Sequence, residues 1–337
     1  MRLLTVSHIK NLVKNIGLSE FYLGLIAELE NTFSRWNMFQ KTARHSFHLD
    51  HGVIELMPTC DDEFYSVKYV NGHPNNPAHQ KLTVAAMGIL SEVNSGYPLL
   101  ISEMTLLTAF RTSATSALAA KYLANRDTKT IGIIGCGAQS EFQVQAQLAL
   151  FPIKTIKYFD IDNNAMKKFH ENLKHLNLEL VPCDQAEFVL KNVDIVTTAT
   201  AAKMRTEILN AQWILPGMHI NAIGGDCPGK TELSVELLKQ AKIVVEYLPQ
   251  SKIEGEIQQL SNEYRIYAEL WELITKKKPG RVSQDEITLF DSVGFALEDF
   301  AILKYVYALS REYKIGSEVE LIPNVSDPKD LFSALAT

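Results

Sequence analysis

A short glycine-containing segment carries the clearest chemical signal in the sequence. Gly135 and Gly137 follow the apolar run 131–134 and precede a helical stretch. Such a strand–turn–helix unit lets the backbone approach a pyrophosphate at the amino end of the helix. Asp160 ends the next apolar run, 25 residues after Gly135, where a carboxylate can bond ribose hydroxyls. The segment predicts a bound dinucleotide, and because a carboxylate repels a 2′-phosphate, it favours NAD over NADP.

The motif departs from the usual pattern at its third glycine position, which holds Ser140. A serine is still small enough for the helix to pack closely against the strand. The alternative interpretation is a glycine-rich turn in some other α/β protein, and the two flanking strands together with Asp160 count against it.

A second glycine-rich segment spans residues 219–232 and begins where a late strand is expected to end. Ligands of open α/β sheets bind at the carboxyl ends of the strands. Asp226 and the residues just before it are therefore predicted to lie near the nicotinamide, with Lys230 close behind. The alternative is an aspartate at a turn or helix cap beside a solvated lysine. The residues of this turn that we expect at the cofactor are Ala222, Ile223, Gly224 and Gly225.

Four charged residues in the first part of the chain stand in apolar or helical surroundings. Arg44, Glu55 and Lys68 interrupt strand-like sequence, where charges usually face water. A buried position would instead require a charged ligand or partner. Arg111 lies among threonines on a predicted helix, where its forked guanidinium could bind a carboxylate or a phosphate.

Three histidines, His45, His48 and His51, invite a metal interpretation. In an extended strand the middle histidine points to the opposite face from the other two. We therefore expect no metal site.

Size and composition exclude several classes of protein. The chain has 337 residues, of which 46% are hydrophobic and 21% charged, which is enough for two globular domains. No uncharged apolar run reaches the roughly 18–20 residues of a membrane span, and the first residues do not resemble a signal peptide. The four cysteines form no C-x-x-C pair, and the net charge is −6, which argues against zinc and nucleic acid. We expect a cytoplasmic protein of small-molecule metabolism.

The order of predicted elements indicates two domains. A helix over 19–36 is followed by strands at 53–57, 64–70, 82–90 and 97–101 and a long helix over 105–124, which is typical of an α+β domain. Strands then alternate with mostly helical stretches, as in a doubly wound sheet; they are expected at 131–134, 155–159, 178–182, 193–198, 218–223, 242–246 and 287–290. The amphipathic segment 293–309 and the tail are expected to pack back on the first domain.

The resulting fold prediction is α/β. A Rossmann-type doubly wound dinucleotide-binding domain covers 113–299, and an α+β substrate-binding and dimerisation domain covers 1–112 and 300–337.

Several segments together resemble the ornithine cyclodeaminase/mu-crystallin family, and the resemblance covers nearly the whole chain. The glycine loop marks only the superfamily, whereas the other segments resemble the cyclodeaminases more specifically. The matching segments are KYVNGHP at 68–74, TLLTAFRT at 105–112, GCGAQSEF at 135–142, GGDCPGKTEL at 224–233, IEGEIQQ at 253–259 and LFDSVGF at 289–295.

The resemblance implies an enzyme that converts L-ornithine to L-proline and ammonia with a bound NAD that is reduced and reoxidised in each turnover. It implies that Asp226 is the catalytic base, that three cations hold the substrate carboxylate, and that the enzyme is a homodimer formed through the first domain. The substrate-binding residues would be Arg44, Glu55, Lys68, Arg111 and Val293. The NAD contacts would include Thr83, Arg111, Ala138, Gln139, Asp160, Thr200, Lys230 and Ser292.

Related activities remain open at this point. The same family resemblance permits a lysine cyclodeaminase, a ketimine reductase, an amino-acid dehydrogenase or an amino-acid-condensing synthase. One methylene group in a pocket is worth only about 1–3 kcal/mol of discrimination, so lysine is the hardest to separate from ornithine. A non-catalytic protein that binds the nucleotide and a small ligand is the alternative from a different class.

Overall fold

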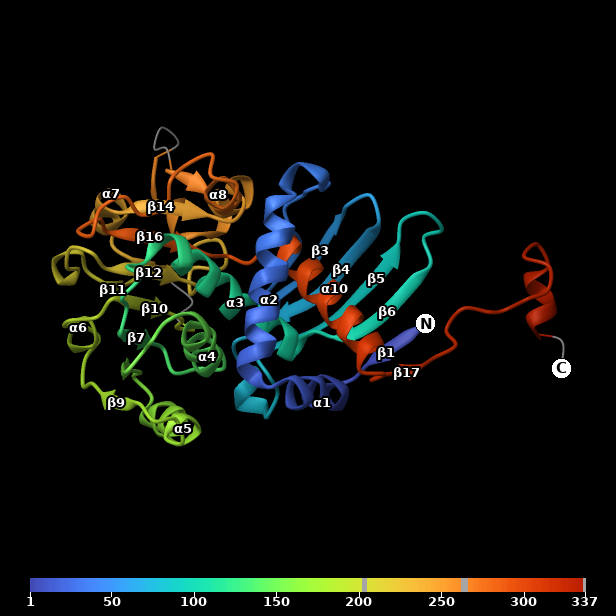
Figure 1. Ribbon diagram of the computed structural model, residues 1–337, viewed down its shortest axis with the longest axis horizontal. Coiled ribbons are helices and arrows are strands. Elements are labelled where there is room, and N and C mark those ends of the chain that lie inside the picture. The colour runs from blue at the N-terminus through green and yellow to red at the C-terminus, as the bar shows by residue number, and fades with distance from the viewer. Residues whose placement is uncertain (202–204, 262–265, 336–337) are drawn as a thin grey trace.

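The computed structural model describes residues 1–201, 205–261 and 266–335, and these residues build two large sheets and one small two-stranded sheet, with helices between and around the large ones (Figure 1). The first sheet uses the N-terminal part of the chain, and the second uses residues 130–291. The α/β fold with a Rossmann-type sheet and a second sheet is confirmed.

The first sheet has seven strands in the order β17-β1-β6-β5-β4-β3-β2. Its central strands are antiparallel neighbours, while β1 runs parallel to β6. The strand bounds are β1 Arg2–Leu4, β2 His45–Leu49, β3 Gly52–Cys60, β4 Phe64–Gly72, β5 Val84–Glu92, β6 Pro98–Glu103 and β17 Ser317–Glu318. The early helices are α1 Val6–Ile16 and α2 Leu18–Ser34, with short 3-10 turns η1 Trp36–Met38 and η2 Asn76–His79.

One face of this sheet is covered by helices, and the other is open. Helix α10 (Ala296–Glu312) packs across β3, β4 and β5, and α2 packs against α10. Their apolar side chains share one core with the sheet, because the inward positions of the strands are buried and the outward ones are not. On the open face Leu56, Tyr69 and Met87 lie opposite one another across three strands.

The second sheet is wholly parallel and has the order β15-β14-β16-β12-β10-β7-β8-β9. The chain leaves β7 toward β8 on one side and returns to β10 on the other, which creates the topological switch point where ligands bind. The strand bounds are β7 Thr130–Ile134, β8 Thr155–Phe159, β9 Glu179–Pro182, β10 Ile195–Thr198, β12 His219–Ala222, β14 Lys242–Val245, β15 Ala268–Glu269 and β16 Thr288–Asp291.

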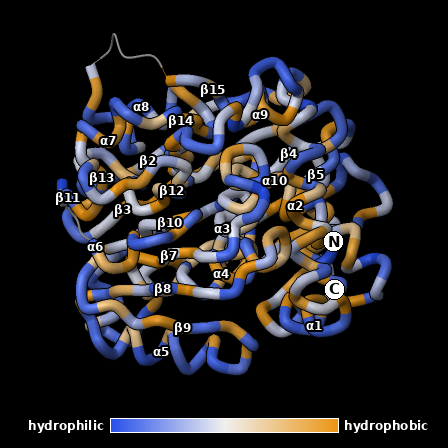
Figure 2. The backbone as a smooth tube through the Cα atoms, turned by 60° about the vertical axis from the view of Figure 1, so that its left-hand side comes forward, coloured by the Kyte–Doolittle hydropathy of each residue, from blue (hydrophilic) through white to orange (hydrophobic). Residues whose placement is uncertain are grey.

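Helices flank this second sheet (Figure 2), and its central strands β7 and β10 are buried along almost their whole length because both faces of the sheet are covered. The long helix α3 (Thr105–Leu123) leads from the first sheet into β7, as predicted. The other elements are α4 Ser140–Leu150, α5 Asn163–Leu173, α6 Ala186–Val189, η3 Ala211–Trp213, α7 Val235–Gln240, α8 Leu248–Glu254, η4 Glu256–Gln259, α9 Leu270–Ile274 and η5 Leu331–Leu335.

The structure differs from the sequence-based prediction at several elements, including the short strands β2, β15 and β17. Strands β11 (Arg205–Leu209) and β13 (Thr231–Leu233) pair in a small separate sheet where we expected helical connections. Strand β1 and helix α1 at the amino end were not predicted. A three-residue strand such as β1 has no measurable period, so only its pairing with β6 and β17 defines it.

The expected packing of the tail on the first domain is only partly correct. Helix α10 and β17 do pack there. Beyond β17 the chain extends away from the sheets (Figure 1), and Leu321, Leu331 and Phe332 are mostly exposed. Within the described residues, no helix has the length and apolarity needed to span a membrane.

Candidate active site

The loop after β7 has the geometry of a pyrophosphate cradle. Gly135 has φ +97°, and a Cβ there would lie 2.5 Å from the carbonyl oxygen of Ala199. A Cβ at Gly137 would meet no atom within 4 Å, so space is open where the backbone should face the phosphates. Ser140 is buried at the start of α4, and its hydroxyl donates to the Gly137 carbonyl at 2.7 Å. These residues fit a dinucleotide.

Asp160 ties the second strand to this loop. One carboxylate oxygen accepts the backbone N–H of Cys136 at 2.6 Å, and the other accepts that of Asp162 at 2.9 Å. The carboxylate therefore lies beside the glycine turn, and its remaining lone pairs can accept ribose hydroxyls. Ala138 and Gln139 complete the loop between Gly137 and α4.

The carboxyl ends of β10 and β12 bring the second group of predicted cofactor residues to the same edge. Ala222 ends β12, and the N–H of Ile223 donates to Thr198, the last residue of β10. Thr200 donates its N–H to a carboxylate oxygen of Glu232 at 2.9 Å, and its hydroxyl donates to the same oxygen. These strand ends lie at the same edge of the sheet as the Gly135 loop.

Gly224 and Gly225 have no room for a side chain. A Cβ at Gly224 would overlap the carboxyl group of Glu232, and one at Gly225 would lie 2.5 Å from Oε1 of Glu256. Both carboxyl groups are buried. The two glycines are thus explained by the acids packed behind them, which place the following residue, Asp226, at the rim.

A chain of three buried acids, which was not predicted from the sequence, lies behind this loop. Asp291 accepts the backbone N–H groups of Glu256 and Ile257 at 2.8 and 3.1 Å. Glu256 in turn accepts those of Glu232 and Leu233 at 2.8 and 3.0 Å. Burial raises the pKa of Glu256 to about 8 and that of Asp291 to about 7. A buried acid bonded to distant backbone has no local sequence signal other than its apolar neighbours.

Asp226 is the exposed member of a pair with Lys230. Their side chains are 3.0 Å apart, and the Asp226 side chain is 53% exposed, whereas that of Lys230 is 11% exposed. Burial lowers the pKa of Lys230, but the Asp226 carboxylate more than offsets this and the net direction is upward. The carboxylate of Asp226 can therefore reach a ligand while Lys230 stays a fixed cation beside it.

The side chains of Arg44 and Glu55 are only 8% and 10% exposed, so the alternative expectation that they face water is wrong. Arg44 Nη1 donates to Glu55 at 3.0 Å, and its Nε lies 3.2 Å from a carboxylate oxygen of Glu254. Ser46 donates to the other oxygen of Glu55 at 2.9 Å. Burial lowers the pKa of Arg44, and the two acids outweigh it. Burial also raises the pKa of Glu254 to about 7.

Lys68 is likewise buried, and the same expectation is wrong for it. Its ammonium is 2.8 Å from Asp299 Oδ1, and the same oxygen accepts from Arg111 Nε at 3.1 Å. Arg111 Nη1 also donates to Glu298 at 2.6 Å. Burial, together with the neighbouring Arg111, lowers the pKa of Lys68 to about 8. The four-residue cluster is held together by charge because it has little access to water.

These charged residues form one cluster between the part of the chain that carries the first sheet and the part that carries the second sheet. Arg44 interacts electrostatically with Arg111 and with Asp226, and Lys68 with Arg44 and Arg111. Arg44 Nη2 also donates to the carbonyl oxygens of Val293 and Gly294, which follow β16 of the second sheet. Most residues predicted to contact the substrate, from both parts of the chain, therefore lie together.

Two sets of residues stand apart from this cluster. Thr83 precedes β5, and its carbonyl accepts from the His73 backbone at 2.9 Å; its role at NAD stays a prediction. His45 lies on β2 with its ring against Phe47 at 4.9 Å. Within the described ranges, no three acids, cysteines or histidines are grouped to hold a metal ion.

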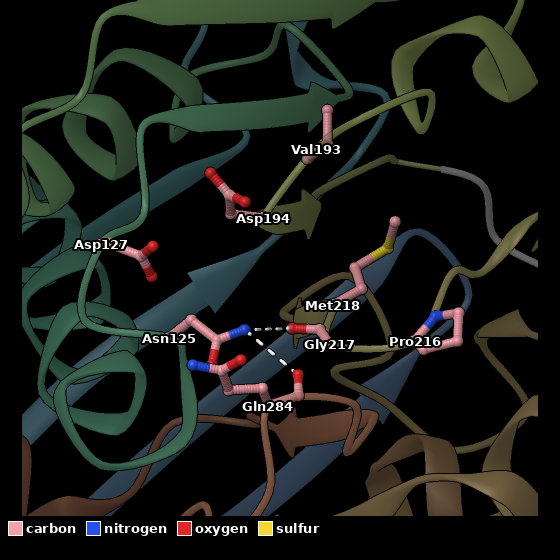
Figure 3. Close-up of a pocket in the computed structure, with 8 residues that line it drawn as sticks. All are labelled: Asn125, Asp127, Val193, Asp194, Pro216, Gly217, Met218 and Gln284. Carbon is pink, nitrogen blue, oxygen red and sulfur yellow. Dashed lines mark hydrogen bonds between the residues drawn. The ribbon is translucent and has the colours of Figure 1, made fainter.

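A pocket of about 290 Å³ lies at the opposite edge of the second sheet, below the amino ends of β10 and β12 (Figure 3). The Asn125 amide donates to the carbonyl oxygens of Gly217 and Gln284, both at 3.3 Å. Its other lining residues include Asp127, Asp194 and Met218. These bonds join connecting loops, and the pocket is separate from the candidate active site because it lies at the other ends of the strands.

Comparisons with known proteins agree on one family. The model of the ornithine cyclodeaminase/mu-crystallin family matches residues 7–314. A protein of Agrobacterium tumefaciens (strain Ach5) named ornithine cyclodeaminase is 48% identical over 332 residues, which are 98% of this chain and 93% of that protein.

Two solved structures are similar over almost their whole length. An archaeal alanine dehydrogenase dimer with bound NAD is 33% identical with a TM-score of 0.88, covering 96% of this chain and 99% of that one. A lysine cyclodeaminase, whose structure describes recognition of L-lysine, L-ornithine and L-2,4-diaminobutyric acid, is 27% identical with a TM-score of 0.92, covering 99% of both chains. The family match, the full-length relatives and the site geometry agree, and this chain belongs to the ornithine cyclodeaminase/mu-crystallin family.

Proposed function

We propose that this protein is an ornithine cyclodeaminase, which converts L-ornithine to L-proline and ammonia with NAD as its cofactor. The observation that carries the proposal is the half-exposed Asp226 carboxylate beside a buried cluster of Arg44, Lys68 and Arg111. A diamino acid needs cations to bind its carboxylate and a base to deprotonate its attacking amine. The 48% identical ornithine cyclodeaminase supports the choice of substrate.

The chain's own residues would bind, orient and move protons. Arg44, Lys68 and Arg111 would hold the substrate carboxylate, and Glu55 would hold an amine, which fixes the chain of the substrate in one orientation. Asp226 would take a proton from the δ-ammonium so that the free amine can attack the oxidised α-carbon, and would return it to the departing ammonia. When bound, NAD supplies the reversible two-electron oxidation of the α-carbon, so it ends each turnover unchanged.

The NAD site would be formed by the two glycine-rich turns and Asp160. In this proposal the cradle of Gly135 and Gly137 faces the pyrophosphate, and Asp160 faces the adenosine ribose. The remaining proposed contacts are Thr83, Arg111, Ala138, Gln139, Thr200, Ala222, Ile223, Gly224, Gly225, Lys230 and Ser292, with Val293 beside the substrate.

The test is incubation of the purified protein with L-ornithine and a trace of NAD, with proline, ammonia and NADH measured together. We expect equal amounts of proline and ammonia, far in excess of the NAD supplied, and no accumulation of NADH. Stoichiometric NADH without proline would contradict the proposal and indicate a simple amino-acid dehydrogenase.

Lysine is the second candidate substrate, because the similar solved structure is a lysine cyclodeaminase that recognises both diamino acids. The same assay with L-lysine, followed for pipecolate, decides between them. Turnover of lysine with none of ornithine would replace the proposed substrate. Turnover of an imino acid alone would instead assign a ketimine reductase.

We propose a division of the chain into a substrate-binding and dimerisation domain (1–112 and 300–337) and an NAD-binding domain (113–299). Both boundaries fall inside helices, α3 and α10, so these two helices would be the connections. We also propose a cytoplasmic location, which the four free cysteines support because reduced thiols suit a reducing compartment.

We further propose a homodimer formed through the open face of the first sheet. Leu56, Tyr69 and Met87 lie side by side there and are 41%, 38% and 59% exposed. A contiguous apolar surface of this kind marks an interface, and the similar alanine dehydrogenase is a dimer.

The prediction for this face is that Met87→Glu gives a monomer at concentrations where the wild type is dimeric. A buried carboxylate without a partner disfavours association. The mass is measured by light scattering coupled to size exclusion. Val282→Glu, at a 66% exposed position of the other half, is the matched control and should remain a dimer. A Met87→Glu variant with the mass of a dimer would refute the interface.

A further inference from the structure

Two carboxyl groups lie next to each other in the interior, close to the candidate site. Glu246 directly follows β14, and Glu298 lies in the first turn of α10. Both residues are 0% exposed, and their side chains are hydrogen-bonded to each other. Two carboxylates without a proton cannot form such a bond, since neither has a donor. One proton must therefore lie between them.

Burial raises the pKa of Glu246, but the donors around this carboxyl group oppose that shift, which makes Glu246 the ionised partner of the two. One oxygen accepts the Ser292 hydroxyl at 2.6 Å, and the other accepts the N–H of Val293 at 2.9 Å and that of Gly294 at 3.1 Å. A carboxylate that receives several N–H and O–H groups is stabilised in its charged form. Glu246 thus fixes the backbone of residues 292–294.

Glu298 has the opposite surroundings. Its Oε2 accepts from Arg111 at 2.6 Å, whereas Oε1 is buried and, among the described residues, receives no donor. Burial and the adjacent Glu246 raise the pKa of Glu298 well above its usual range. These surroundings place the proton on Glu298 rather than on Glu246, because Oε2 accepts from Arg111 while Oε1 receives no donor from the part of the chain that the structure describes.

The segment 292–294 is held from its other side by the Arg44 guanidinium and the Gln250 side-chain amide. Arg44 donates to the carbonyl oxygens of Val293 and Gly294, and Gln250 donates to the latter at 2.7 Å. Gly294 has φ +80°, and a Cβ there would lie 2.5 Å from Arg111 Nη1. The N–H groups of Val293 and Gly294 thus face Glu246 and their carbonyls face Arg44, while a side chain at position 294 would collide with Arg111.

We propose that Glu298 is a protonated carboxyl that donates to ionised Glu246, and that this acid pair positions Ser292, Val293 and Gly294 against Arg44 and Arg111. Both glutamates are positioning residues, because they act through the segment and the guanidinium rather than on a ligand. The effect on turnover rests on the proposed ornithine cyclodeaminase function, whereas the location of the proton does not.

The pair should make the protein sensitive to alkaline pH. The charged groups facing it are Arg111 on α3 and Asp299 on α10, with Lys68 of β4 behind Asp299 and Arg44 across the segment. Glu298 holds its proton in the folded state and loses it in the unfolded state above its ordinary pKa of 4.5. Stability therefore falls as pH rises from there through the raised pKa, because the unfolded state binds fewer protons.

Matched amide variants locate the proton. In Glu298→Gln the amide oxygen can still accept from Arg111 and the amide nitrogen can donate to Glu246, so it mimics the protonated acid. In Glu246→Gln the amide nitrogen meets donors from Ser292, Val293 and Gly294. Leaving buried donors unpaired should lower kcat/KM by about 10- to 100-fold. Glu298→Gln should lower kcat/KM at neutral pH less than Glu246→Gln does, and it should lose the fall of activity and melting temperature at high pH.

Glu28→Gln serves as the control, because Glu28 pairs with Lys304 of the same helix α10 at a partly exposed site; it should keep the alkaline fall. Equal losses in both amide variants, or an unchanged alkaline fall in Glu298→Gln, would overturn the proposal. Infrared difference spectra of wild type minus Glu298→Gln should show the band of a protonated carboxyl, and its absence would also overturn it. If the protein shows this band but does not convert ornithine to proline, the protonated Glu298 is supported and the proposed function is wrong.

Discussion

Replacement of Asp226 by asparagine should lower ornithine turnover by about 10²–10⁴-fold, the usual contribution of a general acid–base group. The carboxylate is 53% exposed at the rim of the cofactor edge and is held by Lys230 at 3.0 Å. An amide of the same shape keeps the turn but cannot take a proton from the δ-ammonium. The loss should therefore appear in kcat, with the dissociation constant for NAD little changed.

The measurement is steady-state proline formation together with NAD titration by fluorescence. Asp62→Asn is the matched control, because the Asp62 side chain is 66% exposed and pairs with Arg35 rather than with a residue of this loop. This variant should behave as wild type. An Asp226→Asn variant with wild-type turnover would remove the base from the mechanism. A wild type and variant that both bind NAD and ornithine without any turnover would instead favour a non-catalytic binding protein.

The parallel sheet could be predicted from the sequence because several of its strands are mostly apolar runs. Residues 131–134 and 155–159 are bounded by turn residues, and both became strands almost unchanged. Strands β11 and β13 could not be predicted, since their pairing joins segments 26 residues apart at Arg205 and Thr231 without an apolar run. An apolar run indicates a strand that is buried on both faces, and the short strands β11 and β13 contain no such run.

The charged residues of the site could be selected by type and context, but their partners could not. Lys68 and Arg111 depend on Asp299, which lies 231 and 188 positions away. In the sequence, Glu298 and Asp299 are acids in the first turn of a helix, where they usually face water and favour the helix dipole. Only the packing of α10 on the first sheet reveals that they are buried.

The cluster has a consequence for how the substrate would bind. Arg44, Lys68 and Arg111 are already paired with Glu55, Glu254 and Asp299, and Arg111 is also bonded to Glu298, the acid proposed to be protonated. A substrate carboxylate would therefore enter a site whose cations are oriented and partly neutralised. Such pairing keeps the cations in place without a ligand, and it limits the desolvation cost of three buried positive charges. Cations that are already oriented would hold the substrate in the one position that hydride transfer to and from NAD requires.

Removal of the Lys68 ammonium should have the largest effect on stability. Its side chain is 1% exposed, and it is 2.8 Å from Asp299, which is fully buried. In Lys68→Met the Asp299 charge stays in the interior with Arg111 as its remaining partner, at 3.1 Å. Breaking a buried ion pair in this way costs about 3–5 kcal/mol of unfolding free energy. We expect a value toward the lower end, because Arg111 still bonds the same oxygen.

A double variant separates this structural cost from the proposed role in substrate binding. Lys68→Met with Asp299→Asn removes both charges, so much of the lost unfolding free energy should return in urea titrations. The KM for ornithine should not return, because the ammonium that we propose to bind the substrate carboxylate is still absent. Recovery of stability and KM together would show that Lys68 serves only to neutralise Asp299. Recovery of neither would contradict the pairing as the source of the cost, whereas recovery of stability alone assigns Lys68 both roles.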